Sequence, residues 1–230
     1  MALPYYVSPE QMMQDKAEYA RKGIAKGKSI IVLEYTDGML LVAENPSASL
    51  NKISEIYDRI AFAGAGRYSE FENLRKAGIR YADLKGFAYD REDVTAKSLA
   101  NAYSQTIGNI FSEAMKPLEV EILVVEVADG GLPNELYRIA FDGSIGDEKG
   151  FVAIGGQAEE LRLHLKDKYE AGLDQKAALR LATGALEAVS NVKVKPQSLE
   201  VAVLERSRTG RKFRRLSHND LTAILTDTEQ

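Results

Sequence analysis

The sequence predicts an α+β protein folded as a four-layer αββα sandwich, in which two antiparallel sheets lie between layers of helices and an extra helix precedes them. Strand-like runs and helical patterns arrive in blocks along the 230 residues, which argues against a doubly wound parallel sheet. Several strand-like runs are apolar almost throughout, as expected for strands covered on both faces. Because the chain has no repeat and no linker rich in Pro, Gly or Ser, we expect a single domain.

The first predicted element is a helix that begins at Ser8-Pro9-Glu10-Gln11. This run places serine at the N-cap, proline at the first helical position and glutamine three residues after the cap. The helix should extend to about residue 22, since Gly23 and Gly27 interrupt the pattern. The segment before this helix holds no residues that would anchor the segment to the rest of the protein. We therefore expect a mobile tail at 1–8, the domain at 9–227 and a polar C-terminal tail at 228–230.

Two predicted β-hairpins follow this helix. Apolar runs at 29–33 and 39–43 flank Thr36-Asp37-Gly38, and an Asp-Gly pair between two such runs is a strong hairpin signal. A second pair of strands is expected at 52–57 and 59–63, with Asp58 at the bend.

Helices and strands fill the rest of the chain. A helix is expected at about 67–76, ended by Gly78, and a longer one at 98–115, closed by Pro117. The later elements are expected as strands at 120–127, 135–141 and 151–154, helices at 158–169 and 174–190, strands at 199–204 and 213–216, and a short helix capped by Ser217-x-x-Asp220.

Composition and charge exclude several classes of protein. The formal net charge is −4, whereas nucleic-acid binders usually carry a basic stripe; the basic residues at 211–215 suit a solvated strand edge as well as a phosphate contact. The absence of cysteine rules out disulfides, thiolate metal sites and a cysteine nucleophile. Residues 1–7 do not resemble a signal peptide, and no apolar run approaches the ~20 residues of a membrane helix. We expect a cytoplasmic protein with no nucleic-acid or membrane partner.

Residue patterns for metal binding or hydrolysis are weak. The two histidines, His164 and His218, have no second histidine or acidic residue at metal-ligand spacing, so we expect structural or exposed roles and no metal. Gly143-Ser144-Ile145-Gly146 approaches a nucleophile elbow but lacks its spacing, and a hairpin turn is the better interpretation.

Gly64-Ala65-Gly66 resembles part of a dinucleotide-binding fingerprint. Ser69 stands where the third glycine would be, and the run ends a series of antiparallel strands instead of opening a parallel sheet. We favour a strand end made of small residues, against which the next helix packs closely.

Motifs in five parts of the chain resemble the α subunits of 20S proteasomes, in the order in which that family carries them. They are Ser8-Pro9-Glu10 with Glu18-Tyr19-Ala20, Gly27 with the hairpin at 35–43, the segment 52–58, the segments 135–139 and 142–144, and the segment 153–159. The details are most similar to the actinobacterial α subunit. The resemblance implies the four-layer sandwich of the N-terminal-nucleophile hydrolases with an added N-terminal helix.

The resemblance implies a subunit without catalytic activity. In the related β subunits a threonine freed by cleavage is the nucleophile, assisted by an aspartate and a lysine, and a threonine needs its own α-amine or a neighbouring base. The positions of this sequence that match these three are Lys28, Glu44 and Lys52, so the nucleophile is missing. No cofactor is implied.

The resemblance also implies assembly and gating. Seven subunits would form a ring in an α7β7β7α7 particle that degrades unfolded proteins, in a pathway linked to pupylation. Pockets between neighbouring subunits would bind the terminal carboxylates of a hexameric AAA ATPase, through Lys52, Gly27 and Gly66. The residues expected to close the pore are Leu3, Tyr5, Tyr6, Val7, Ser8, Pro9 and Tyr19.

The residues taken alone leave two other functions open. One is an active N-terminal-nucleophile hydrolase, and a more distant one is a nucleotide-dependent enzyme that uses Gly64 and Gly66. Without the resemblance, Lys52 would be read as a surface lysine at the start of a strand. The sequence also departs from the family near its start, where Gln11-Met12 replaces the usual Gly-Arg, so the details of the gate stay open.

Overall fold

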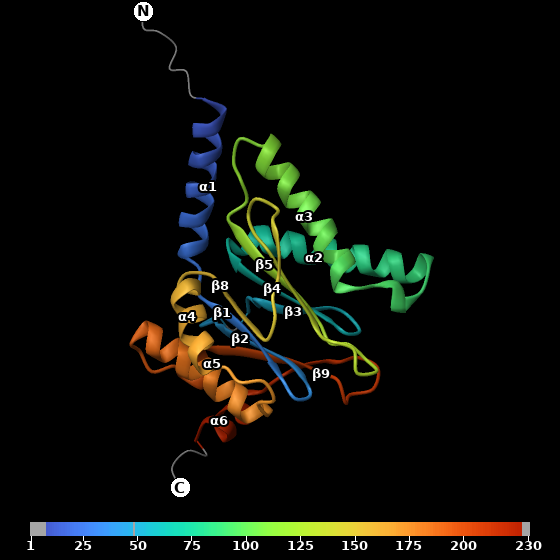
Figure 1. The fold of residues 1–230 in the computed structure, drawn as a ribbon, viewed down its shortest axis with the longest axis vertical. Helices are drawn as coiled ribbons and strands as arrows, with labels where there is room; N and C mark the ends of the chain where they lie inside the picture. The colour runs from blue at the N-terminus through green and yellow to red at the C-terminus, as the bar shows by residue number, and fades with distance from the viewer. Residues whose placement is uncertain (1–7, 48, 227–230) are drawn as a thin grey trace, which may run out of the picture.

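The structure of the chain, a computed structural model, describes residues 8–47 and 49–226. Two five-stranded antiparallel sheets pack face to face, helices cover the outer face of each, and the first helix projects from one end of the sandwich (Figure 1). The predicted α+β sandwich with an added N-terminal helix is therefore confirmed.

Each sheet combines strands that are distant in the sequence. The first sheet has the order β10-β9-β2-β1-β8, from β1 (Ile30–Tyr35), β2 (Gly38–Glu44), β8 (Phe151–Ile154), β9 (Leu199–Glu205) and β10 (Phe213–Arg215). The second has the order β3-β4-β5-β6-β7, from β3 (Ile53–Tyr57), β4 (Ile60–Gly66), β5 (Val120–Glu126), β6 (Glu135–Ile139) and β7 (Ile145–Asp147). Both predicted hairpins are confirmed, as β1–β2 and β3–β4.

Six α-helices lie within the described ranges. They are α1 (Pro9–Ala25), α2 (Tyr68–Ala88), α3 (Ala96–Glu113), α4 (Ala158–Lys168), α5 (Gln175–Ser190) and α6 (His218–Thr226). Helices α4, α5 and α6 cover the first sheet, and α2 and α3 cover the second. The predicted cap of α6 is confirmed, because the Ser217 hydroxyl accepts from the Asp220 amide at 3.2 Å while the Asp220 carboxylate accepts from Ser217.

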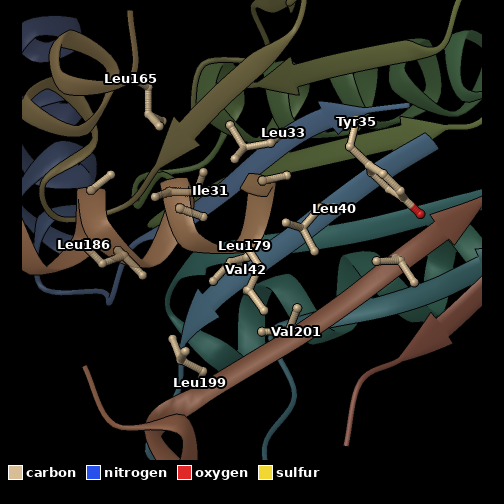
Figure 2. Close-up of a cluster of buried hydrophobic side chains, with 14 of the residues drawn as sticks. Ile31, Leu33, Tyr35, Leu40, Val42, Leu165, Leu179, Leu186, Leu199 and Val201 are labelled. Carbon is tan, nitrogen blue, oxygen red and sulfur yellow. The ribbon is translucent and has the colours of Figure 1, made fainter. Parts of the chain in front are cut away.

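The strands of the first sheet are buried on both faces, which explains their nearly continuous apolar runs. Ile31 and Leu33 of β1 pack with Leu179 of α5 in the outer core (Figure 2). Their neighbours Ile30 and Val32 point the other way, into the core between the two sheets. This alternation buries residues 30–33 of β1 and 38–43 of β2.

One predicted helix end was wrong, and one strand was missed. Helix α2 does not end near Gly78 but continues to Ala88, and Gly78 is buried at mid-helix where an added Cβ would overlap the Tyr103 hydroxyl. The glycine is therefore explained by close helix packing. The strand β7 was missed; it pairs with β6 after the turn at Gly143, whose positive φ of 85° and whose place in a hairpin confirm the turn interpretation.

The basic side chains at 211–215 lie beside acidic ones. Each basic side chain of the patch pairs with a carboxylate. The pairs are Arg211 with Glu55, Lys212 with Asp129, Arg214 with Glu205, and Arg215 with Glu200. The strand-edge interpretation is thus the better one, since these cations are already neutralised. Among the described residues, no helix combines the length and apolarity needed to cross a bilayer.

Candidate functional site

Lys52 lies directly before β3. Its ammonium group donates a hydrogen bond to the main-chain carbonyl of Lys28 at 3.0 Å. Lys28 belongs to the short connection between α1 and β1, so this contact joins the second sheet to the start of the first.

A buried carboxylate fixes the backbone at Lys52. Glu200 of β9 is only 8% exposed, and its two oxygens accept from the Lys52 amide at 2.8 Å, the Ile53 amide at 3.1 Å and the Asn45 side chain at 2.7 Å. Arg215 also donates to Glu200. A buried charge that is paired and fully hydrogen-bonded holds its surroundings rigidly, so Lys52 starts from a defined position.

The environment of the Lys52 ammonium group disfavours its positive charge. Burial lowers the pKa of the Lys52 ammonium, and the nearby Lys28 charge lowers it further, while Glu200 and Glu44 act in the opposite direction. Because folding lowers this pKa, stability rises as the pH climbs from the folded pKa towards the ordinary lysine value of 10.5. An added anion beside Lys52 would relieve the same penalty.

The structure brings Gly27 and Gly66 together beside this lysine. A Cβ on Gly27 would lie 2.9 Å from the Gly66 amide nitrogen, closer than real side chains approach a backbone. Gly66 has a φ of 101°, and a Cβ there would overlap the carbonyl oxygen of Glu119. Two residues before Gly66, the Gly64 amide donates a hydrogen bond to the Lys52 carbonyl at 3.0 Å, which joins this strand end to Lys52. The three predicted pocket residues therefore share one location.

Gly156 is a further member of this cluster that our sequence reasoning did not assign to it. Its amide donates to the Gly27 carbonyl at 3.0 Å, and a Cβ on Gly156 would lie 2.7 Å from the carbonyl oxygens of Ala25 and Gly27. The only signal in the sequence was the Gly155-Gly156 pair after a strand, which does not indicate its distant neighbour.

The three positions matched to the catalytic residues of β subunits also converge. The Lys28 ammonium lies 3.5 Å from the Glu44 carboxylate, and the Lys28 carbonyl accepts from Lys52. A lysine side chain thus occupies the nucleophile position. Residue 28 also has no free α-amine, since α1 and Gly27 precede it in the chain. The three residues therefore lie together without the group that would attack a peptide bond.

The predicted gating residues are only partly within the described residues. Leu3, Tyr5, Tyr6 and Val7 lie outside them. The Ser8 hydroxyl accepts from the Gln11 amide at 3.2 Å and Pro9 is the first residue of α1, as predicted. Tyr19 lies on α1 with 48% of its surface exposed, and its ring centroid is 5.9 Å from the Lys116 ammonium.

Tyr19 is part of a polar cluster between α1 and the segment after α3. Burial alone would raise the pKa of the Glu119 carboxyl, but hydrogen bonds from Lys116 and Tyr19 lower it. Glu119 links Tyr19 to the Lys52 cluster, because its side chain accepts a hydrogen bond from Tyr19 and its carbonyl lies against Gly66.

The other candidate sites have structural explanations. A Cβ on Gly64 would lie 2.7 Å from the Phe71 ring of α2, which confirms the small-residue strand end against which a helix packs. Within 8–47 and 49–226, no group of three or more His, Asp or Glu side chains could hold a metal ion. His218 is exposed and His164 is partly buried on α4.

Comparison with known proteins identifies the family. The profile of the family described as "Proteasome subunit" matches residues 24–204. Proteins named "Proteasome subunit alpha" are similar over nearly their whole length: 52% identity with that of Kineococcus radiotolerans (99% of this chain, 100% of the relative) and 55% with that of Xylanimonas cellulosilytica (96% and 95%). The chain belongs to the proteasome subunit family.

Within this family the proteasome subunit described here is of the α type and is not catalytic, as we predicted. The alternative of an active hydrolase was therefore wrong, in agreement with the lysine at position 28. The nucleotide-dependent alternative is set aside with it, because Gly64 serves helix packing. Membership of the family implies assembly with other subunits into the proteasome core.

Proposed function

We propose that seven copies of this α subunit form the outer ring of a cytoplasmic 20S particle, stacked as α7β7β7α7 with β subunits that carry the peptidase activity. Exposed apolar surface beside α1 supports contact with a neighbouring copy. Met12, Tyr19 and Met115 are 49%, 48% and 97% exposed and line a groove of 710 Å³ between α1 and the segment after α3. Exposed apolar surface of this kind is typical of interfaces.

Within this ring, residues 1–8 would form the gate and 9–227 the wall. Ser8 caps α1 and Pro9 is its first residue, so the tail joins a capped and therefore well-defined helix end. Unfolded proteins would enter where the seven tails meet.

Lys52, with Gly27 and Gly66, would receive the terminal carboxylate of a hexameric AAA ATPase. The observation that carries this proposal is the position of the Lys52 ammonium, held beside glycine backbone with its charge disfavoured by burial. A carboxylate would supply the missing counter-charge, and the absence of side chains on the two glycines would let it approach.

The test is the variant Lys52→Ala in an assembled particle. A charge-assisted contact is worth about 1.5–3 kcal/mol, so each pocket should lose roughly ten- to a hundredfold in affinity for the ATPase. Several pockets act together, so the loss in ATPase-stimulated degradation should be larger than for one pocket. Ring assembly and thermal stability should stay close to those of the wild type.

Lys52→Arg is the matched control. It should rescue docking only in part, because a planar guanidinium does not replace a compact ammonium in the same pocket. If a folded Lys52→Ala ring were stimulated as strongly as the wild type, Lys52 would not be the docking residue. A general loss of stability with failed assembly would instead indicate a purely structural role.

A further inference from the structure

We propose that Lys28 is a second binding residue of this site, and that the Lys28 and Lys52 ammonium groups bind one terminal carboxylate of a protein partner together. Glu44 holds the Lys28 side chain until that carboxylate arrives. This inference rests on the proposed docking function of Lys52, because it adds a residue and a charge pattern to the same pocket.

Both the main chain and the side chain of Lys28 lie at the pocket. Its carbonyl accepts from the Lys52 ammonium at 3.0 Å, so its main chain is in direct contact with the proposed docking residue. The same residue follows Gly27, whose backbone approaches Gly66. The Lys28 side chain is 57% exposed, so its ammonium group can reach an incoming ligand.

The ion pair between Lys28 and Glu44 is weak. Its nitrogen lies 3.5 Å from Glu44, longer than the 2.7–2.9 Å of a good charge-assisted hydrogen bond. The Lys28 end of the pair is exposed, although the Glu44 side chain is only 21% exposed, and an ion pair with one end in solvent contributes little stability. A carboxylate that contacts both lysines can therefore displace Glu44 at little cost.

The local charge balance favours an anion. Burial is the main cause that lowers the pKa of the Lys52 ammonium and the Lys28 charge adds to it, while Glu200 is already engaged by Arg215 and by main-chain amides. One carboxylate between the two ammonium groups would replace a repulsion by two attractions. Its two oxygens can accept from both lysines at once.

The experiment measures how much Lys28 contributes to binding of the ligand's terminal charge. The assembled α–β particle is titrated with a fluorescent peptide that carries the last ten residues of its ring ATPase, either with a free carboxylate or as the C-terminal amide. The ratio of the two affinities isolates the contribution of the terminal charge. The titration is carried out for the wild type and for Lys28→Met, Lys52→Ala, Glu44→Gln and Lys26→Met.

The expected results follow from the geometry. Lys28→Met should lower the acid-to-amide affinity ratio by about two- to fivefold, the size expected for an exposed charge pair. Glu44→Gln should raise the affinity for the acid by a similar factor, because it releases Lys28. Lys26→Met removes the same charge from a neighbouring exposed position and should leave the ratio unchanged.

The variants separate the two proposals. If Lys52→Ala lowers the ratio and Lys28→Met does not, the role of Lys28 is overturned while docking at Lys52 stands. If neither variant changes the ratio, docking through Lys52 itself is wrong. An equal effect of Lys26→Met would mean that overall charge, not Lys28, attracts the peptide, and would also overturn the inference.

Discussion

Gly66 ends β4 in a backbone conformation that side chains rarely adopt, with a φ of 101°. Gly66→Ala should lower the free energy of unfolding by about 1–3 kcal/mol, because the new Cβ would be strained and would overlap the Glu119 carbonyl. The measurement is a denaturant titration of both proteins in the same oligomeric state.

Gly184 offers a matched control for this substitution. It is an exposed glycine within α5, and an added Cβ would meet no atom within 4 Å. Gly184→Ala should therefore stabilise the protein by about 0.5–1 kcal/mol. Equal effects of the two substitutions would mean that Gly66 is not required by its backbone conformation.

The glycines also mark what the sequence can and cannot predict at the residue scale. A glycine after a helical pattern predicts a helix end, yet Gly78 lies inside α2 because the Tyr103 hydroxyl occupies the space of a side chain. Tyr103 lies on another helix, and no local spacing connects the two residues. The approach of Gly156 to Gly27 was unpredictable for the same reason.

At the scale of elements, α5 depends on a side-chain cap. The Asp174 carboxylate accepts from the Ala177 amide at 2.7 Å, and the helix it begins packs Ala178, Leu179 and Ala182 against the first sheet. Asp174→Ala should lower the free energy of unfolding by about 0.5–2 kcal/mol, whereas Asp174→Asn should retain most of the cap. Thermal melting of both variants tests this, and equal melting points for Ala and Asn would contradict a capping role.

Element types were easier to predict than element ends. Long apolar runs in β1 and β2 and the capped start of α1 follow from local patterns, and the structure confirms them. The strand β7 was missed because it has three residues and no fully buried side chain, so it leaves no apolar signal. It is recognised as a strand through its antiparallel pairing with β6.

At the scale of the molecule, the candidate site exists because the two sheets meet. Lys52 precedes the second sheet, Lys28 precedes the first, and Glu200 comes from β9, more than a hundred residues later in the chain. Residue patterns alone indicated only a surface lysine. The likeness to α subunits was needed to select Lys52, and the structure was needed to add Lys28 and Gly156 around it.

The N-terminal segment leads to a prediction for the whole particle. Residues 2–7 carry four bulky apolar or aromatic side chains, Leu3, Tyr5, Tyr6 and Val7, and seven copies that meet at one axis could bury them against each other. Ordering each tail costs about 1–2 kcal/mol per residue, which makes closure modest and reversible. Removal of 2–7 should therefore cause a several-fold rise in small-peptide hydrolysis by an assembled α–β particle. The cap at Ser8 is kept, so α1 should stay intact. A Gly/Ser segment of equal length should open the pore as well; hydrolysis at the wild-type rate in both variants would place the gate elsewhere.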